Sequence, residues 1–257
     1  MSETRALIEA KGLRKRFGTI EAVRGIDLTV ERGQVLGFLG PNGAGKSTTM
    51  RMLTGYLVPD AGSVRIDGHD LATHPLEAKR RIGYLAEGAP AYMDMRVEDF
   101  LAFVARTRGY RGAEVRERVD RAVARVHLEP CRGQRIETLS KGYKRRTGIA
   151  QALIHDPPVI VMDEPTDGLD PNQKFEVRQL VRELGRTRAI ILSTHILEEV
   201  EAVCTRAVII NKGATVFDGT PKELDAQVPK NIETNRLDHV FRTLTARQTK
   251  AAKGGSR

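Results

Sequence analysis

Long apolar runs are missing from this sequence. Its longest unbroken run of apolar residues, 100–105, is far shorter than the roughly 20 residues that a helix needs to cross a bilayer. Residues 1–5 lead into no apolar stretch of the kind that signal peptides contain. We therefore expect a cytosolic protein that neither spans a membrane by itself nor is exported.

Cysteine is scarce as well. The two cysteines, Cys131 and Cys204, stand in unrelated contexts, which argues against a disulfide framework and against a metal knuckle. This usage also fits the cytosol.

Acidic residues are outnumbered by basic ones. Forty-two Lys and Arg against 33 Asp and Glu give a formal net charge of +9. Such an excess is compatible with nucleic acid, anionic lipid or phosphate-bearing ligands, and also with an ordinary solvated basic surface. Part of it lies in the polar, glycine-containing tail 246–257, which we expect to be disordered.

Short apolar segments alternate with segments of helical periodicity, which is the pattern of an α/β protein. The segments 159–162, 189–192 and 207–210 are apolar throughout, as expected for strands covered on both faces of a mostly parallel sheet. Residues 88–138 instead show two helical patterns separated by a breaker at 108–112, and we interpret them as an inserted helical subdomain. Further strands are expected at 26–30, 34–39, 64–66 and 82–85.

A glycine-rich loop carries the strongest chemical signal. It follows the pattern G-x-x-x-x-G-K-[ST], with an apolar strand before it and a helix-compatible stretch, 47–53, after it. In such a loop the backbone N–H groups point at phosphates, Lys46 reaches the β- and γ-phosphates, and the Ser47 hydroxyl binds Mg²⁺. The expected nucleotide-binding residues of the loop are Gly40, Pro41, Asn42, Gly43, Ala44, Gly45, Lys46, Ser47 and Thr48. The sequence therefore predicts an α/β phosphate-loop NTPase core that binds ATP and Mg²⁺.

Two carboxylates follow the apolar strand at 159–162. Asp163 and Glu164 would lie at the carboxyl end of that strand, which is where α/β folds bind ligands. Asp163 is expected to hold Mg²⁺, and Glu164 to orient or deprotonate the attacking water. Solvated carboxylates at a strand end are the plainer alternative, but the phosphate loop upstream favours the catalytic one.

The segment just before this strand resembles the signature motif of the ABC ATPases. It comprises Ser140, Lys141, Gly142 and Tyr143 after a leucine, with Lys141 and Tyr143 where the commonest form has Gly and Gln. Four further motifs of that family resemble positions here in the same order. They are an adenine-stacking aromatic at Phe17, the Q-loop position at Glu87, the D-loop at 168–170 and the switch histidine at His195.

The resemblance implies an architecture and a mechanism. The fold would be a mostly parallel sheet flanked by helices, with an antiparallel β region near the N-terminus. Two copies would close head to tail, so that the signature motif of one copy caps the ATP on the phosphate loop of the other. Glu164 and His195 would be catalytic, and Ser47, Glu87 and Asp163 would hold Mg²⁺.

The motifs resemble most the exporter-type branch of the family, in which separate membrane subunits are driven by the ATPase. That implies a peripheral position on the cytoplasmic face of the membrane, held by permease subunits, with no nucleic acid as partner. The helical insertion would receive the membrane subunit, through Tyr92, Met93, Met95 and Phe100 as candidates; a core role for Phe100 is the alternative.

Two departures leave alternatives open. Glu87 stands where the commonest form of the Q-loop has Gln, so it brings a negative charge in place of a neutral amide. This charge could raise the affinity for metal while lowering the stabilisation of negative charge on the transferring phosphoryl group. Lys141 could lie near the opposing phosphates or point to solvent.

The C-terminal segment departs from that branch too. That branch often carries a further domain before its C-terminal segment, and we expect this domain to be missing after residue 228, where the ATP-binding domain would end. Within residues 229–245, the stretch 237–244 is predicted to form a short helix that folds back onto the domain or its partner.

Two other functions are alternatives for this sequence. A soluble ABC-type ATPase that acts on ribosomes or nucleic acid would suit the positive charge, but such proteins usually carry tandem domains or a long coiled coil. An unrelated phosphate-loop kinase or GTPase would lack the signature motif and the positioned His195.

Overall fold

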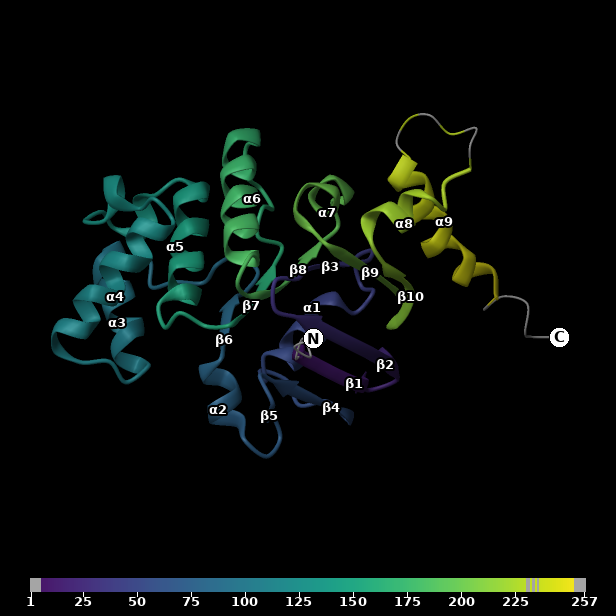
Figure 1. The fold of residues 1–257 in the computed structure, drawn as a ribbon, viewed down its shortest axis with the longest axis horizontal. Coiled ribbons are helices and arrows are strands. Elements are labelled where there is room, and N and C mark those ends of the chain that lie inside the picture. The colour runs from purple at the N-terminus through teal and green to yellow at the C-terminus, as the bar shows by residue number, and fades with distance from the viewer. Residues whose placement is uncertain (1–5, 230–231, 233, 235, 252–257) are drawn as a thin grey trace, which may run out of the picture.

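The computed structural model describes residues 6–229, 232, 234 and 236–251, with side chains as far as residue 246 (Figure 1). A six-stranded sheet forms its centre, in the order β10-β9-β3-β8-β7-β6. Its five strands from β9 to β6 are parallel, and β10 runs antiparallel to β9 at the edge. The strands are β3 (Val35–Leu39), β6 (Ile82–Leu85), β7 (Val159–Asp163), β8 (Ala189–Thr194), β9 (Arg206–Asn211) and β10 (Ala214–Gly219).

Both faces of the central sheet are covered. On β3, Leu36 and Phe38 face a core shared with α1 (Lys46–Leu53), whereas Leu39 faces the core on the opposite side. This explains why β3 and β7 are buried at every position. The helices α6 (Pro171–Gly185) and α7 (Leu197–Val203) cover the face away from α1.

A second, antiparallel sheet packs over α1. It has the order β2-β1-β4-β5, comprising β1 (Ala6–Phe17), β2 (Ile20–Glu31), β4 (Ala61–Ile66) and β5 (His69–Asp70). The fragments predicted at 26–30 and 64–66 belong to it. Strand β1 was not predicted, because its second half is rich in basic residues; pairing on both edges, with β2 and β4, holds it in the sheet.

The helical part lies at one end of the molecule. Its helices are α3 (Val97–Thr107) and α4 (Gly112–Arg125), joined at the breaker predicted from the sequence, followed by the 3₁₀ turns Glu129–Cys131 and Ile136–Thr138 and by α5 (Lys141–Leu153). The remaining short helix, α2 (Pro75–Arg80), precedes β6.

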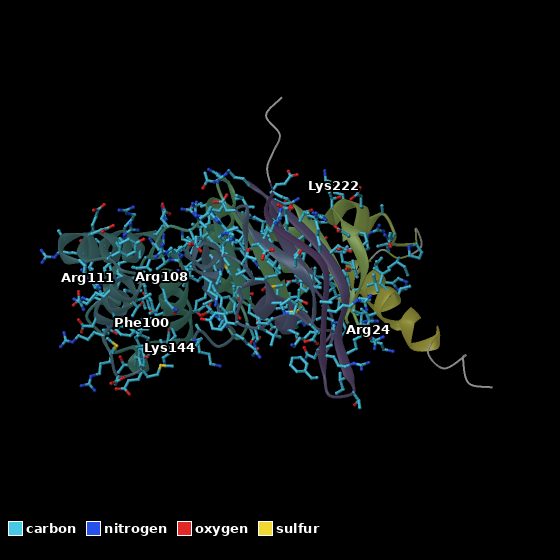
Figure 2. All side chains as sticks on the ribbon, turned by 90° about the horizontal axis from the view of Figure 1, so that it is seen from below. Arg24, Phe100, Arg108, Arg111, Lys144 and Lys222 are labelled. Carbon is cyan, nitrogen blue, oxygen red and sulfur yellow. The ribbon has the colours of Figure 1, made fainter. Side chains whose placement is uncertain are left out.

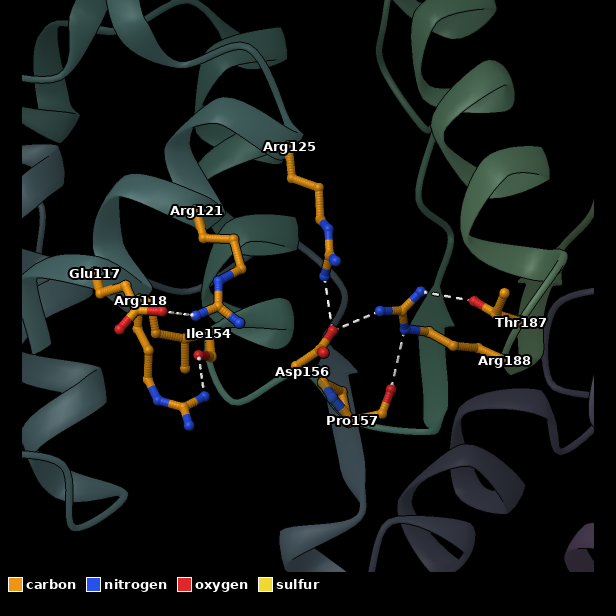
Figure 3. Close-up of polar contacts among 9 residues, drawn as sticks. All are labelled: Glu117, Arg118, Arg121, Arg125, Ile154, Asp156, Pro157, Thr187 and Arg188. Carbon is orange, nitrogen blue, oxygen red and sulfur yellow. Dashed lines mark hydrogen bonds and ion pairs between the residues drawn. The ribbon is translucent and has the colours of Figure 1, made fainter. Parts of the chain in front are cut away.

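An ionic contact ties the helical part to the core (Figure 3). Asp156, in the loop between α5 and β7, accepts a hydrogen bond from Arg125 of α4 at 2.7 Å. The same carboxylate oxygen accepts one from Arg188, which lies just before β8. One carboxylate thus joins three segments that are far apart in the chain.

The C-terminal helices lie beside the edge strand β10. They are α8 (Pro221–Asp225) and α9 (Arg236–Ala251). Leu237 and Val240 of α9 are buried, and Asn211 of β9 donates a hydrogen bond to the Thr245 carbonyl at 2.6 Å. The helix is longer than the predicted 237–244.

Residues 246–251 therefore continue a helix instead of forming the disordered tail that we expected. Neither Gly nor Pro interrupts 236–252, and extending an anchored helix costs little compared with starting one. Residues 252–257 lie outside the described residues.

Basic side chains are spread over the molecule (Figure 2). Arg108, Arg111 and Lys144 belong to the helical part, and Arg24 and Lys222 lie at the opposite end. These labelled residues show no gathering of positive charge at one end. None of the helices among the described residues is long and apolar enough to span a bilayer.

Candidate active site

The phosphate loop connects β3 to α1 through a backbone that requires glycine. A Cβ on Gly40 would lie 2.5 Å from the Ile210 carbonyl oxygen. Gly45 has a φ of 105° and a Cβ there would lie 2.5 Å from the Ala22 carbonyl oxygen. No side chain among the described residues caps the N-terminus of α1, so its first N–H groups are left for an anion.

A cavity of about 620 Å³ opens over this loop. It brings together residues from five separate segments of the chain. Its lining comprises Phe17, Ala22, Asn42, Gly43, Gly45, Lys46, Ser47, Thr48, Glu87, Glu164, Asp167 and His195. Of the remaining loop residues, Gly40 and Pro41 accept hydrogen bonds from Lys46 through their carbonyl groups, and Ala44 is buried.

Asp163 and Glu164 lie where β7 ends. Asp163 is buried and accepts a hydrogen bond from the Ser193 hydroxyl of the neighbouring strand β8. The backbone N–H of Glu164 donates to the same hydroxyl at 3.0 Å. Glu164 Oε1 lies 3.2 Å from Nδ1 of His195, so the carboxylate and the imidazole form one unit at the cavity.

Glu164 adopts a left-handed backbone with a φ of 47°. Such a conformation is uncommon for a residue other than glycine and costs about 1 kcal/mol or more. Backbone strain of this kind tends to persist at functional sites, where surrounding contacts enforce it.

The charges of the site act on Lys46. Its side chain is only 6% exposed, and the amine donates to the Gly40 carbonyl at 2.7 Å. Burial lowers the pKa of Lys46, while the carboxylates of Glu164, Asp163 and Glu87 oppose this effect. The three carboxylates therefore act on the amine electrostatically. Oxygen ligands are the kind that Mg²⁺ prefers, but among the described residues no three or more His, Cys, Asp and Glu side chains are grouped so as to hold a metal ion.

The signature segment lies elsewhere. Ser140, Lys141, Gly142 and Tyr143 start α5, and none of them lines the cavity that contains Lys46. Gly142 packs so tightly on Gln173 of α6 that a Cβ would lie 2.4 Å from its side chain. The amine of Lys141 lies 3.8 Å from the position of a Cβ on Gly168 in the D-loop of the same chain. Lys141 is exposed, and its side chain lies beside the D-loop of the same chain.

The sequence did not reveal a network of buried polar groups beneath the site. Glu199 of α7 accepts hydrogen bonds from the hydroxyl groups of Thr166 and Thr194. Burial raises the pKa of Glu199, and the hydrogen bond from Thr194 opposes this effect. In the sequence Glu199 cannot be told from its neighbour Glu198, which is exposed, so no local signal could have identified it.

Comparison with known proteins decides the family. The family model described as "ABC transporter" matches residues 23–167, which is more than half of the chain. The chain belongs to the ABC transporter family. The predicted family and the predicted fold class are thereby confirmed, and this ABC subunit is an ATPase that binds and hydrolyses ATP for a transporter.

Curated relatives of this ABC ATPase carry specific names. It is 38% identical over 219 residues to the "Nod factor export ATP-binding protein I" of Ralstonia nicotianae, covering 85% of this chain and 68% of the relative. It is also 38% identical over 237 residues to the "Daunorubicin/doxorubicin resistance ATP-binding protein DrrA" of Streptomyces peucetius, covering 91% of this chain and 71% of that protein. The ribosomal or nucleic-acid alternative is not favoured by these relatives.

Solved structures agree on the fold. A structure described as "ATP binding subunit of ABC transporter" matches with a TM-score of 0.81 at 30% identity, covering 93% of this ABC ATPase and 99% of that chain. A dimeric ATP-binding cassette bound to ADP and phosphate matches with a TM-score of 0.76 at 22% identity, covering 83% and 98% of the two chains. The latter likeness shows the fold alone.

Proposed function

We propose that this ABC ATPase is the motor subunit of an exporter and that two copies close head to tail around two ATP molecules. The observation that carries the dimer is the separation within one chain of the signature residues Ser140 to Tyr143 from the cavity over Lys46. A second copy would complete the site. The names of the relatives that act in Nod factor export and drug resistance support export.

In this proposal the phosphate loop holds the triphosphate. Backbone N–H groups of the phosphate loop and the Lys46 amine bind the β- and γ-phosphates, and Phe17 at the rim of the cavity stacks on the base. Ser47, Asp163 and Glu87 would hold Mg²⁺, and the ion would supply positive charge to neutralise the phosphates. The signature residues of the partner copy cap the γ-phosphate through the N-terminus of α5.

Hydrolysis is assigned to the pair at the end of β7 and β8. Glu164 orients the attacking water and accepts its proton. His195, 3.2 Å from Glu164, donates toward the γ-phosphate and fixes the carboxylate. Loss of the γ-phosphate removes the charge that the partner copy binds, and the dimer opens.

Trapping the closed dimer tests this proposal. Glu164→Gln should bind ATP and form a dimer that persists, because water is no longer activated while both halves of the site remain. Light scattering during size-exclusion chromatography with Mg·ATP measures the dimer, and phosphate release measures hydrolysis. Hydrolysis at the parent rate would show that Glu164 is not the base.

The membrane partner is proposed to dock on the helical part. Tyr92 and Met93 are 56% and 43% exposed, and the Tyr92 ring packs edge-on against Phe103 and Phe100. Phe100 is 3% exposed, so it supports this surface from the core instead of docking itself; Met95 is half-buried. Permease subunits bound here would hold the ATPase on the cytoplasmic face of the membrane.

Substituting Tyr92 and Met93 by Ser should weaken co-purification with the membrane subunits and leave ATP affinity unchanged. Phe175→Ser is a matched control, because Phe175 is exposed on α6 outside this surface. An equal loss of co-purification in the Phe175→Ser control would contradict the docking surface. So would a loss of ATP affinity that accompanies the loss of association in the Tyr92 and Met93 variant.

A further inference from the structure

A buried carboxylate joins the two loops that carry Glu164 and His195. Glu199 on α7 is 2% exposed. Its Oε1 accepts a hydrogen bond from the Thr166 hydroxyl, and its Oε2 accepts one from the Thr194 hydroxyl at 2.7 Å. Breaking either bond leaves a buried polar group without a partner, so the two bonds hold the loops together.

On one side, Glu199 fixes the turn that presents His195. Thr194 is the last residue of β8, directly before His195. Its hydroxyl oxygen also accepts a hydrogen bond from the Ile196 N–H at 3.0 Å, so it closes a turn around the histidine. The backbone N–H of Glu199 donates to the Ile196 carbonyl at 3.2 Å. The turn is therefore held by both the side chain and the backbone of Glu199.

On the other side, Glu199 fixes the loop that follows Glu164. Thr166 is buried two residues after Glu164. The loop folds on itself around Thr166, since the Asp167 N–H donates to the Glu164 carbonyl at 3.2 Å and the Leu169 N–H donates to the Thr166 carbonyl at 3.3 Å. A displacement of Glu199 would shift this compact loop as one piece.

We propose that Glu199 is a positioning residue that sets the separation of Glu164 and His195. Those two side chains are 3.2 Å apart, and each is carried by a loop that is hydrogen-bonded to one oxygen of the same carboxylate. Glu199 is not among the residues that line the cavity. The inference rests on the roles proposed above for Glu164 and His195.

Glu199→Gln tests the inference with almost no change in size. The amide replaces one acceptor oxygen by a donor, so one of the two threonine hydroxyl groups loses its acceptor. We expect kcat for ATP hydrolysis to fall about tenfold while the Kd for ATP stays within about twofold, because misplacement affects the reacting groups and not the phosphate loop. Glu198→Gln, on the exposed neighbour, should change neither.

The decisive measurement combines this variant with His195→Ala. If Glu199 acts through His195, Glu199→Gln should slow single-turnover hydrolysis by less than about twofold in the His195→Ala background. An equal tenfold loss in both backgrounds would overturn the inference. A His195→Ala variant with parent activity would instead disprove the proposed role of His195, so the two failures are distinct.

Thr166→Val provides a second route if Glu199→Gln does not fold. It removes one of the two bonds to Glu199 with little change in shape, and it should reproduce the fall in kcat with unchanged ATP affinity. Parent kcat in a folded Thr166→Val variant would overturn the inference as well.

Discussion

The N-termini of helices α1 and α5 differ in how much of the proposed ATP site surrounds each of them within one chain. We call the N-terminus of α1 the complete end and that of α5 the incomplete end. The N-terminus of α1 follows a glycine loop, has no side-chain cap, and lies in a cavity whose lining includes Lys46, Glu164 and His195. The N-terminus of α5 is capped by its own Ser140, whose side chain accepts from the Tyr143 N–H at 3.4 Å, and Ser140 is exposed. In the proposed dimer the first binds phosphate within one chain, whereas the second is half of a site that the partner copy completes.

The largest effect is expected at the complete end. Lys46→Ala removes the one buried amine from a cavity lined by three carboxylates, so their repulsion of the triphosphate is no longer offset. The Kd for ATP should rise about a hundredfold or more. Isothermal titration with Mg·ATP measures it, and Lys222→Ala, on α8 and outside the cavity lining, is the control. An unchanged Kd would mean that the cavity is not the phosphate site.

A smaller effect is expected at the incomplete end. Ser140→Ala should leave the ATP affinity of a single chain unchanged and lower steady-state hydrolysis about tenfold, because only the partner's site is affected. Phosphate release and equilibrium binding separate the two quantities. A raised Kd for ATP in the monomer would contradict the division between the two ends.

Mixing the two variants sharpens the comparison. A dimer of one Lys46→Ala chain and one Ser140→Ala chain contains one site with both Lys46 and Ser140 and one site with neither. Activity should therefore reappear when two inactive or weakened preparations are combined. If the mixture were no more active than the average of the separate Lys46→Ala and Ser140→Ala preparations, a site shared between two copies would be ruled out.

The complete end could be predicted from the sequence because its signals are local. The glycines, Lys46 and Ser47 are adjacent in the chain, and Asp163 and Glu164 directly follow an apolar strand. Backbone curvature and strand termination place such residues without help from distant segments.

The supporting contacts could not be predicted, because they join residues that are far apart. Glu199 reaches Thr166 across 33 positions, and Ser193 reaches Asp163 across 30. Strand β10 was missed as well, since its six residues mix apolar and polar types and it is held by pairing with β9. The helical extent of α9 beyond residue 244 likewise follows from anchoring at Leu237, Val240 and Thr245.

The smallest predicted effect concerns the link between the helical part, which carries the signature, and the core, which carries the phosphate loop. Asp156 joins Arg125 to Arg188 (Figure 3). Burial alone would raise the pKa of Asp156, but the hydrogen bonds from Arg125 and Arg188 hold it below its ordinary value. A depressed carboxyl pKa stabilises the folded state above the unfolded pKa, and this stabilisation is lost as the pH falls through the folded pKa.

Asp156→Asn should therefore lower the free energy of unfolding by about 1 kcal/mol at pH 7, a modest value because the carboxylate is partly exposed. Asn tolerates the left-handed backbone of this position, where φ is 53°, so the change removes charge without adding strain. Urea unfolding at pH 7 and at pH 3 measures the difference, which should shrink at the lower pH because the parent carboxylate becomes protonated. If the variant lost the same free energy of unfolding at both pH values, the loss would come from packing and not from charge. Asp94→Asn, at an exposed position, serves as the control.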